Sequence, residues 1–134
     1  MQDCPPRFIN VNGKLMDVSH PQVMGILNVT PDSFYVESRK QTDDAIINRI
    51  HQIQEEGGAI IDIGAYSSRP GAMHLSVEEE MHRLRKGLQL IHLHAPQAIV
   101  SVDTFRADVA KMCVEEYGVA IINDISGGQM DQQM

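Results

Sequence analysis

The sequence of 134 residues predicts an α/β protein that forms the first half of a (β/α)8 barrel of the TIM type. About four parallel strands and three helices are expected, preceded by a small N-terminal β-hairpin. Three observations support this fold class: short apolar runs alternate with helical segments, each apolar run is continuous, and each ends in a cluster of polar residues. Continuous apolar strands are typical of parallel sheets that are covered on both faces.

The predicted strands follow one another at regular intervals. They are residues 23–29, 59–64, 98–104 and 119–126. Residues 8–18 precede them as two extended runs around Asn12 and Gly13, a pair that readily adopts the positive φ angles of a tight hairpin turn. The chain is therefore expected to begin with a hairpin and to continue as a βαβαβαβ series.

Helical segments lie between these strands, at residues 42–56, 76–95 and 106–117. Thr42 is the expected N-cap of the first helix. Ser76 and Glu79 have the spacing of a capping box at the start of the second, and its acidic run, residues 78–80, is interpreted as a first turn stabilised by the helix dipole. The third helix is expected to end near Gly118.

Two folds share this order of elements, the barrel and the doubly wound sheet. A doubly wound sheet usually opens with a glycine-rich phosphate loop, and no G-x-G-x-x-G motif follows the first predicted strand. In a barrel the carboxyl ends of all strands surround one mouth, which explains why every strand here ends in polar residues. A complete barrel takes about 250 residues, so half a barrel is expected.

Composition and charge exclude several classes of partner. The chain has 18 acidic and 11 basic residues, a formal net charge of -7, and no cluster of Lys and Arg that could bind nucleic acid or an anionic membrane. Its apolar runs are too short to span a membrane, and residues 1–8 lack the features of a secretory signal. With only Cys4 and Cys113, no disulfide framework is indicated, and a cytoplasmic location is predicted.

The predicted strand ends carry the candidate site residues. They include the carboxylates of Asp62 and Asp103, the amides of Asn28 and Asn123, and Arg69 in a rigid Arg-Pro-Gly turn. Fixed donors and acceptors of this kind suit a polar heterocycle and a phosphate, and the Asn28 oxygen could bind a metal. Asp62 fits two interpretations equally well, a buried carboxylate satisfied by backbone N–H groups or a direct ligand contact.

Four motifs in this order resemble the N-terminal half of the dihydropteroate synthase family. They are NVTPDSF, DIGAYSSRPGA, SVDTFRADVA and INDISGG, and the likeness covers nearly all of the chain from Phe8 onward. The resemblance implies a single domain, residues 1–134, and an enzyme of folate biosynthesis. Such enzymes join para-aminobenzoate to 6-hydroxymethyl-7,8-dihydropterin diphosphate with Mg²⁺, release pyrophosphate, and are the target of sulfonamide drugs.

The resemblance also implies roles for individual residues. Asp103 and Asn123 would hold the edge of the pterin ring, Asn28 would contact Mg²⁺ and the diphosphate, and Asp103 and Arg69 would be catalytic. The expected substrate-binding residues are Asn28, Phe34, Ser68, Arg69, Pro70, Asp103, Asn123 and Ile125. The first loop departs from the common family pattern at residues 35–40, and the second does so more mildly at residues 65–68.

Two rival interpretations remain open. A methyltetrahydrofolate-dependent methyltransferase domain shares the pterin-binding aspartate and asparagine, but it would not need the NVTPDSF and SSRPG loops. A non-catalytic pterin-binding fragment is the other rival, because half of the family's site is absent from these residues. Open strand edges and uncovered apolar surface are costly, so the chain is expected to self-associate or to dock onto the missing C-terminal half.

Overall fold

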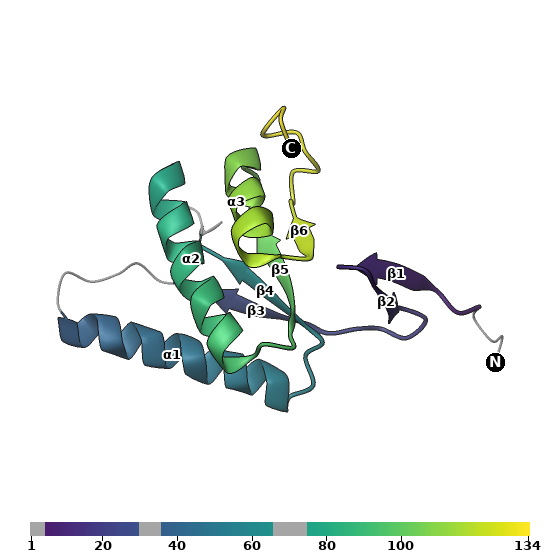
Figure 1. Cartoon of the computed structure of the whole chain (residues 1–134), viewed down its shortest axis with the longest axis horizontal. Coiled ribbons are helices and arrows are strands. Elements are labelled where there is room, and N and C mark those ends of the chain that lie inside the picture. Colours follow the sequence, from purple (N-terminus) through teal and green to yellow (C-terminus); the bar gives the residue numbers. More distant parts are fainter. Residues whose placement is uncertain (1–4, 30–35, 66–74) are drawn as a thin grey trace.

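A computed structural model of the chain describes residues 5–29, 36–65 and 75–134, with only the backbone described over 36–41. The elements in chain order are β1 (Phe8–Val11), β2 (Lys14–Asp17), β3 (Met24–Asn28), α1 (Val36–Glu55), β4 (Ile60–Gly64), α2 (Val77–His94), β5 (Ile99–Asp103), α3 (Ala107–Tyr117) and β6 (Ile121–Asn123) (Figure 1). The predicted hairpin, the parallel strands and the helices between them are all confirmed.

The four parallel strands lie in the order β3-β4-β5-β6, the order in which they occur in the chain. A βαβ crossover is almost always right-handed, so a sheet that grows in one direction places every connecting helix on the same face. Helices α1, α2 and α3 accordingly pack side by side along the sheet (Figure 1). A doubly wound sheet would reverse its strand order and carry helices on both faces, so the arrangement is that of a partial barrel.

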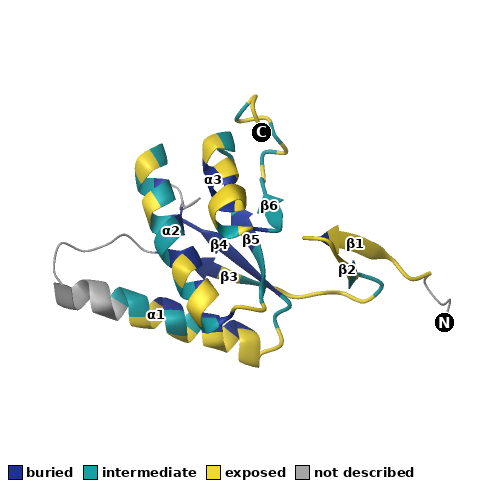
Figure 2. Ribbon diagram, in the orientation of Figure 1, coloured by how far each residue is buried: buried dark blue, intermediate teal, exposed yellow. Residues whose placement is uncertain are grey.

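The core lies between the sheet and these helices, where the buried residues of both gather (Figure 2). Its largest fully buried apolar side chains include Leu27, Ile50, Ile61, Ile63, Leu84, Ile91, Val102 and Val109. Gly87 lets α2 approach the sheet closely. A Cβ atom at this position would collide with Ile63 Cδ1 and lie 3.0 Å from Val29 Cγ2.

The opposite face of the sheet is only partly covered in the described part of the chain. Along β3, Leu27 is buried against the helices, while Met24, Ile26 and Asn28 are exposed, and Ile26 is 58% exposed. The expectation that this strand is covered on both faces is therefore wrong for the described residues. The reason is geometric, because all three helices lie on one side and the other side corresponds to the interior of a barrel.

The first helix begins earlier than predicted. Helix α1 starts at Val36, so Thr42 lies inside the helix and is not its N-cap. Residues 36–41 contain no Gly or Pro and include Glu, Arg, Lys and Gln, which are good helix formers, so the helix extends past Thr42. At the start of α2 the prediction is confirmed in part, because the Glu79 N–H donates to Ser76 Oγ at 3.1 Å.

The N-terminal hairpin has the predicted turn. Asn12 and Gly13 adopt φ angles of 53° and 79°, as a two-residue hairpin turn with positive φ at both positions requires. Much of the hairpin is exposed (Figure 2). It is tied to the body of the protein by the Asn12 side chain, whose Nδ2 donates to the Gly118 carbonyl oxygen at 2.7 Å.

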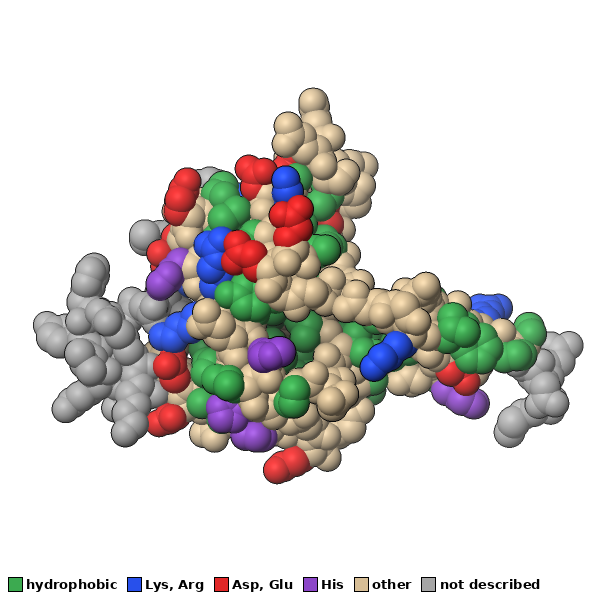
Figure 3. Space-filling model, in the orientation of Figure 1, with side chains coloured by type: hydrophobic (Ala, Val, Ile, Leu, Met, Phe, Trp, Pro, Cys, Tyr) green, Lys and Arg blue, Asp and Glu red, His purple; other side chains and the backbone are tan. Residues whose placement is uncertain are grey.

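The outer surface of the helices is charged. Acidic and basic side chains lie close together over α2 and α3 (Figure 3), and Arg85 of α2 pairs with Glu116 of α3 at 2.7 Å. Among the described residues, no helix combines the length and the apolar character needed to cross a membrane.

Candidate active site

The carboxyl ends of the four parallel strands bring three predicted site residues into one row. Asn28 is in register with Gly64, Gly64 with Asp103, and Asp103 with Asn123. Neighbours in register in a parallel sheet point to the same face, and side chains alternate between faces along each strand. These four positions, named here the rim row, therefore face away from the helices, as the exposed Ile26 does.

Gly64 leaves a gap within the rim row. A Cβ atom at this position would lie 3.4 Å from the Asp103 Cβ atom and 3.6 Å from its Oδ2 atom. The glycine therefore makes room for the Asp103 side chain, which lies over this position of β4.

A second row lies one step deeper, two residues earlier in each of the four strands. It consists of Ile26, Asp62, Ser101 and Ile121. Asp62 is 6% exposed, and its Oδ2 accepts a hydrogen bond of 3.2 Å from Asn123 Nδ2. Its Oδ1 and the hydroxyl of Ser101 are buried and have no partner among the described residues. Asp62 is thus a buried carboxylate whose partner is a side chain of the rim row.

Asp103 lies among negative charges and is half-buried. Burial raises the pKa of its carboxyl group above the ordinary value of 3.8, and the negative charges of Asp62, Glu80 and Asp124 raise the pKa further. Both effects disfavour the charged form. A ligand that donates N–H groups or brings positive charge would relieve them, so this end of the sheet favours such ligands.

A buried ion pair supports the segment that follows Asp103. Glu80, in the first turn of α2, is 0% exposed, and its Oε1 accepts from Thr104 Oγ1 at 2.9 Å. Its Oε2 accepts from Arg106 Nη1 at 2.9 Å, and Arg106 Nη2 donates to the Leu75 carbonyl oxygen at 2.6 Å. The pair thereby joins the beginning of α2 to the end of β5 and the start of α3.

The interpretation of Glu80 as part of an acidic first turn stabilised by the helix dipole is therefore incomplete. The helix dipole still acts on this residue, but its carboxylate is buried and paired. A signal for this was present in the sequence, because Glu80 lies three residues after Val77 and four before Leu84, on the apolar stripe of its helix. A charged residue on an apolar stripe indicates a buried partner.

The turn after β6 is fixed by Asp124. Its carboxylate accepts from the Ser126 N–H at 2.9 Å, from the Ser126 hydroxyl at 2.8 Å and from the Gly128 N–H at 2.9 Å. The Ser126 hydroxyl contributes most to lowering the pKa of Asp124. Ile125 lies in this turn directly beyond the rim row and is 79% exposed. It is close to the site in sequence, and its side chain contributes little to the core.

The remaining predicted site residues, Phe34, Ser68, Arg69 and Pro70, lie outside the described residues. Within residues 5–29, 36–65 and 75–134, no three His, Cys, Asp or Glu side chains come together as a metal site. The structure therefore brings together Asn28, Asp103 and Asn123, and it places the predicted Asp62 in contact with Asn123. It adds Glu80 as a buried carboxylate bonded to Thr104, the residue after Asp103.

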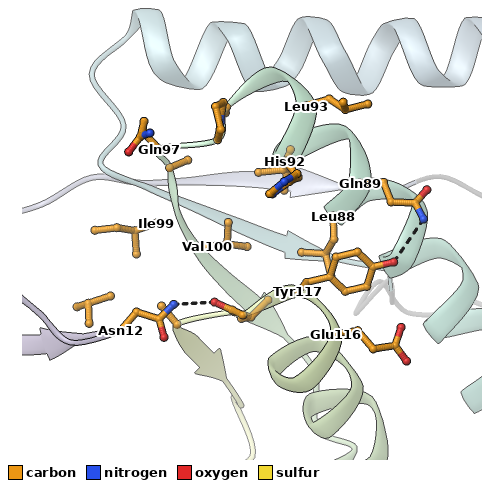
Figure 4. A pocket seen from close by; sticks show the side chains of 18 of the residues that line it. Asn12, Leu88, Gln89, His92, Leu93, Gln97, Ile99, Val100, Glu116 and Tyr117 are labelled. Atoms are coloured by element: carbon orange, nitrogen blue, oxygen red, sulfur yellow. Dashed lines mark hydrogen bonds between the residues drawn. The ribbon is translucent and has the colours of Figure 1, made fainter.

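A cavity of about 760 Å³ lies at the other end of the sheet. It is bordered by the ends of α2 and α3, the start of β5, the segment that leads from α3 to β6, and Asn12 of the hairpin (Figure 4). Gln89 and Tyr117 meet at its wall, with Nε2 and the hydroxyl oxygen 3.4 Å apart. None of the rim row lines it, and barrel enzymes bind their substrates at the carboxyl ends of the strands. We therefore place the candidate active site at the rim row.

Comparisons with known proteins agree with this geometry. The family model described as "Pterin binding enzyme" matches residues 24–134. The mitochondrial folate synthesis bifunctional protein of Arabidopsis thaliana is 40% identical over 136 residues, which span 99% of this chain and 24% of that protein. Dihydropteroate synthase of Xanthomonas albilineans, solved with 4-aminobenzoic acid, superimposes with a TM-score of 0.78 at 35% identity, over 94% of this chain and 45% of that one.

A further solved structure is dihydropteroate synthase from Anaplasma phagocytophilum with bound 6-hydroxymethylpterin-monophosphate. It gives a TM-score of 0.73 at 37% identity and covers 84% of this chain and 43% of that chain. The chain thus spans less than half the length of these relatives. The family match covers most of the chain and includes the entire parallel sheet. The chain belongs to the pterin binding enzyme family.

Proposed function

We propose that residues 1–134 form one domain, the N-terminal half of a dihydropteroate synthase, a transferase of folate biosynthesis. The enzyme would condense 6-hydroxymethyl-7,8-dihydropterin diphosphate with para-aminobenzoate to give dihydropteroate and pyrophosphate. The observation that carries the proposal is the rim row, in which Asn28, Asp103 and Asn123 share one register and one face. The ligands of the solved relatives, 4-aminobenzoic acid and 6-hydroxymethylpterin-monophosphate, are the corresponding substrate classes.

The pterin ring would bind along the rim row by its edge. A pterin carries N–H donors on its amino group and ring nitrogens, and the Asp103 carboxylate is an acceptor in a half-buried setting. Hydrogen bonds to an ionised acceptor are about twice as strong as neutral ones. The same negative charge would stabilise the positive charge that develops on the ring as the diphosphate departs. Asp103 is therefore the proposed catalytic residue of the described part.

The reaction exchanges one bond for another at the methylene carbon of the pterin. The amino nitrogen of para-aminobenzoate forms the new C–N bond, the C–O bond breaks, and its electron pair leaves with pyrophosphate. The nitrogen then loses a proton. No strong base is needed, so positioning and electrostatics supply most of the rate enhancement. In this proposal Arg69 is catalytic by neutralising the leaving group, and Phe34, Ser68, Pro70 and Ile125 complete the substrate site.

Mg²⁺ is the cofactor of this proposal. The donor set fits in one respect, because Asn28 is exposed at the end of β3 and its carboxamide oxygen is a hard ligand. Mg²⁺ in phosphoryl sites takes few protein ligands and keeps several waters and substrate phosphates, so no cage of protein carboxylates is required. When bound, the ion would neutralise charge on the departing diphosphate.

We also propose that the inner face of the sheet is covered in the functional protein, by a second copy of the chain or by a C-terminal half. Ile26 is 58% exposed on this face, and β3 and β6 are the edge strands of the parallel sheet that the structure describes. Uncovered apolar surface and unpaired strand edges both promote association. Sedimentation of a compact monomer at high concentration would contradict this. The small number of cysteines supports a cytoplasmic location.

Three measurements test the proposed function. Calorimetric titration with the pterin diphosphate and Mg²⁺ should give saturable binding, and an assay of pyrophosphate release should show turnover once para-aminobenzoate is added. A sulfonamide should compete with para-aminobenzoate for its slot. Binding without turnover would select the second candidate, a non-catalytic pterin-binding fragment. This candidate is supported by the observation that the chain covers less than half the length of the solved relatives. The absence of any pterin binding would contradict both candidates.

A further inference from the structure

The side chain of Asp62 lies directly behind that of Asn123. The two residues come from strands that do not neighbour each other, β4 and β6, and their side chains meet on the inner face of the sheet. Asn123 Nδ2 donates to Asp62 Oδ2 at 3.2 Å, and Asp62 is 6% exposed. A buried carboxylate at the second row is therefore in contact with a side chain that lines the rim row.

The chemistry of the two groups fixes which end of the Asn123 amide faces inward. An ionised carboxylate accepts hydrogen bonds and donates none, whereas an amide has one end that donates and one that accepts. The NH2 end of Asn123 must therefore face Asp62, which leaves Oδ1 as the atom that Asn123 can offer to a ligand. Turning the amide over would bring two oxygen atoms together and leave a buried carboxylate without this donor, which is costly.

Asp62 accepts no second hydrogen bond from the described residues. Its Oδ1 is buried without a partner among the described residues, and so is the hydroxyl of Ser101, its neighbour in register on β5. Among the described residues, Asn123 is therefore the hydrogen-bond donor to this carboxylate. This dependence makes the orientation of the amide strongly preferred.

We propose that Asp62 is a positioning residue that locks the Asn123 amide, so that the rim row offers acceptors, Asn123 Oδ1 and the Asp103 carboxylate, to the ligand. Such a pair selects heterocycles that carry an amino group and a ring N–H side by side. It rejects a ring of the same shape with a carbonyl oxygen in place of the amino group. The choice of a pterin as ligand rests on the proposed function, whereas the lock on the amide does not.

The lock can be measured without any ligand. In protein labelled with nitrogen-15, the side-chain NH2 protons of Asn123 should exchange with solvent at least about tenfold more slowly than those of Asn48, which is exposed on α1. The substitution Asp62→Asn should remove most of this protection. Equal exchange rates at Asn123 and Asn48 in the unaltered protein would overturn the lock.

The selectivity is tested with two probes, 6-hydroxymethylpterin and its analogue with an oxo group in place of the 2-amino group. The unaltered chain should prefer the pterin, and Asp62→Asn should reduce the ratio of the two dissociation constants by about tenfold, because the amide can then turn over. Ser101→Ala, which removes the neighbouring buried hydroxyl, is the matched control and should leave the ratio unchanged. Circular dichroism confirms that each variant is folded.

The outcomes separate this inference from the proposed function. If Asp62→Asn weakens both probes equally and keeps their ratio, Asp62 does not set the selectivity and the inference fails. If the unaltered chain binds neither probe, the proposed function fails, and the exchange measurement alone decides whether the amide is locked.

Discussion

The guanidinium of Arg106 lies 2.9 Å from the carboxylate of Glu80, and that carboxylate is completely buried. The same carboxylate accepts from the hydroxyl of Thr104, the residue that follows Asp103. The Glu80 carboxylate of α2 therefore holds the segment that follows β5 in place. An anchor of this kind keeps the Asp103 backbone in place while leaving its side chain available at the rim row.

Removing this anchor should be strongly destabilising. Glu80→Ala leaves the Arg106 charge in a largely buried site without its partner, which typically costs about 3–5 kcal/mol of unfolding free energy. Urea denaturation of the chain measures the loss. Glu79→Ala is the matched control, since it removes an adjacent glutamate whose 2.9 Å pair with Arg83 is partly exposed, and it should cost about 1 kcal/mol or less. Similar losses of unfolding free energy in both variants would show that the buried pair contributes no more to stability than the partly exposed one.

Asp103→Asn should raise stability at neutral pH and abolish pterin binding. Burial raises the folded pKa of Asp103, so its favourable contribution is fully present below the unfolded pKa, near 3.8, and is lost as the pH rises through the folded pKa. At neutral pH the carboxylate thus opposes folding, and its removal should raise the unfolding free energy. Because the group is only half-buried, solvent screening keeps the gain to about a few tenths of a kcal/mol.

The same variant should abolish measurable pterin binding, because the ligand loses its ionised acceptor. Unfolding curves at several pH values and calorimetry on the same samples test the two effects together. Asp108→Asn, on the exposed first turn of α3, changes the charge equally. It should lower stability slightly by removing a favourable helix-dipole contact, and it should leave binding intact. A loss of stability in Asp103→Asn at neutral pH would contradict the assigned direction of its pKa.

Gly87→Ala should destabilise the protein although alanine is the better helix former. The added Cβ would collide with Ile63 Cδ1 and approach Val29 Cγ2 to 3.0 Å, and overpacking of a dense core costs about 1–3 kcal/mol. The gain in helix propensity, about 1 kcal/mol, offsets part of this loss. Gln89→Ala, at an exposed position of the same helix, is expected to be close to neutral in the same thermal unfolding experiment. A more stable Gly87→Ala variant would mean that α2 can move away from β4 at no cost.

Asn12 contributes to the hairpin in two ways that two variants can separate. Asn12→Gly keeps the positive φ of the turn and loses the 2.7 Å hydrogen bond to Gly118, whereas Asn12→Ala loses both. Hydrogen exchange of the β1 and β2 amides should therefore speed up moderately in the glycine variant and more strongly in the alanine variant, by a further factor of about 5. Equal exchange rates in the two variants would show that the positive φ at residue 12 does not contribute to the stability of the hairpin.

The sequence predicts the fold well because the signals for its elements are local. Asn12 and Gly13 specify the hairpin turn, Ser76 caps α2, and Gly118 ends α3 in a left-handed conformation. Each of these features depends on a few consecutive residues. The predicted start of α1 at Thr42 is too late, because the favourable helix propensity of residues 36–41 outweighs the preference of Thr for an N-cap position.

The candidate site is predictable only in part, because its supporting contacts are long-range. Asn28, Asp103 and Asn123 could be grouped from their positions at strand ends. The partner of Glu80 at Thr104 is 24 residues away, and the hydrogen bond between Asp62 and Asn123 spans 61 residues. No local pattern specifies such pairs. They arise from the register of the sheet, which places residues from distant strands side by side.

The alternation of side chains along these strands has a consequence for how the protein can change. Residues such as Leu27, Ile63 and Val102 face the helices, while their immediate neighbours in sequence, Asn28, Gly64 and Asp103, face the mouth. Directed evolution could therefore vary one set for new substrates while the other preserves the thermal tolerance of the scaffold. Neighbouring codons would then be under different selection, one for substrate binding and the next for stability.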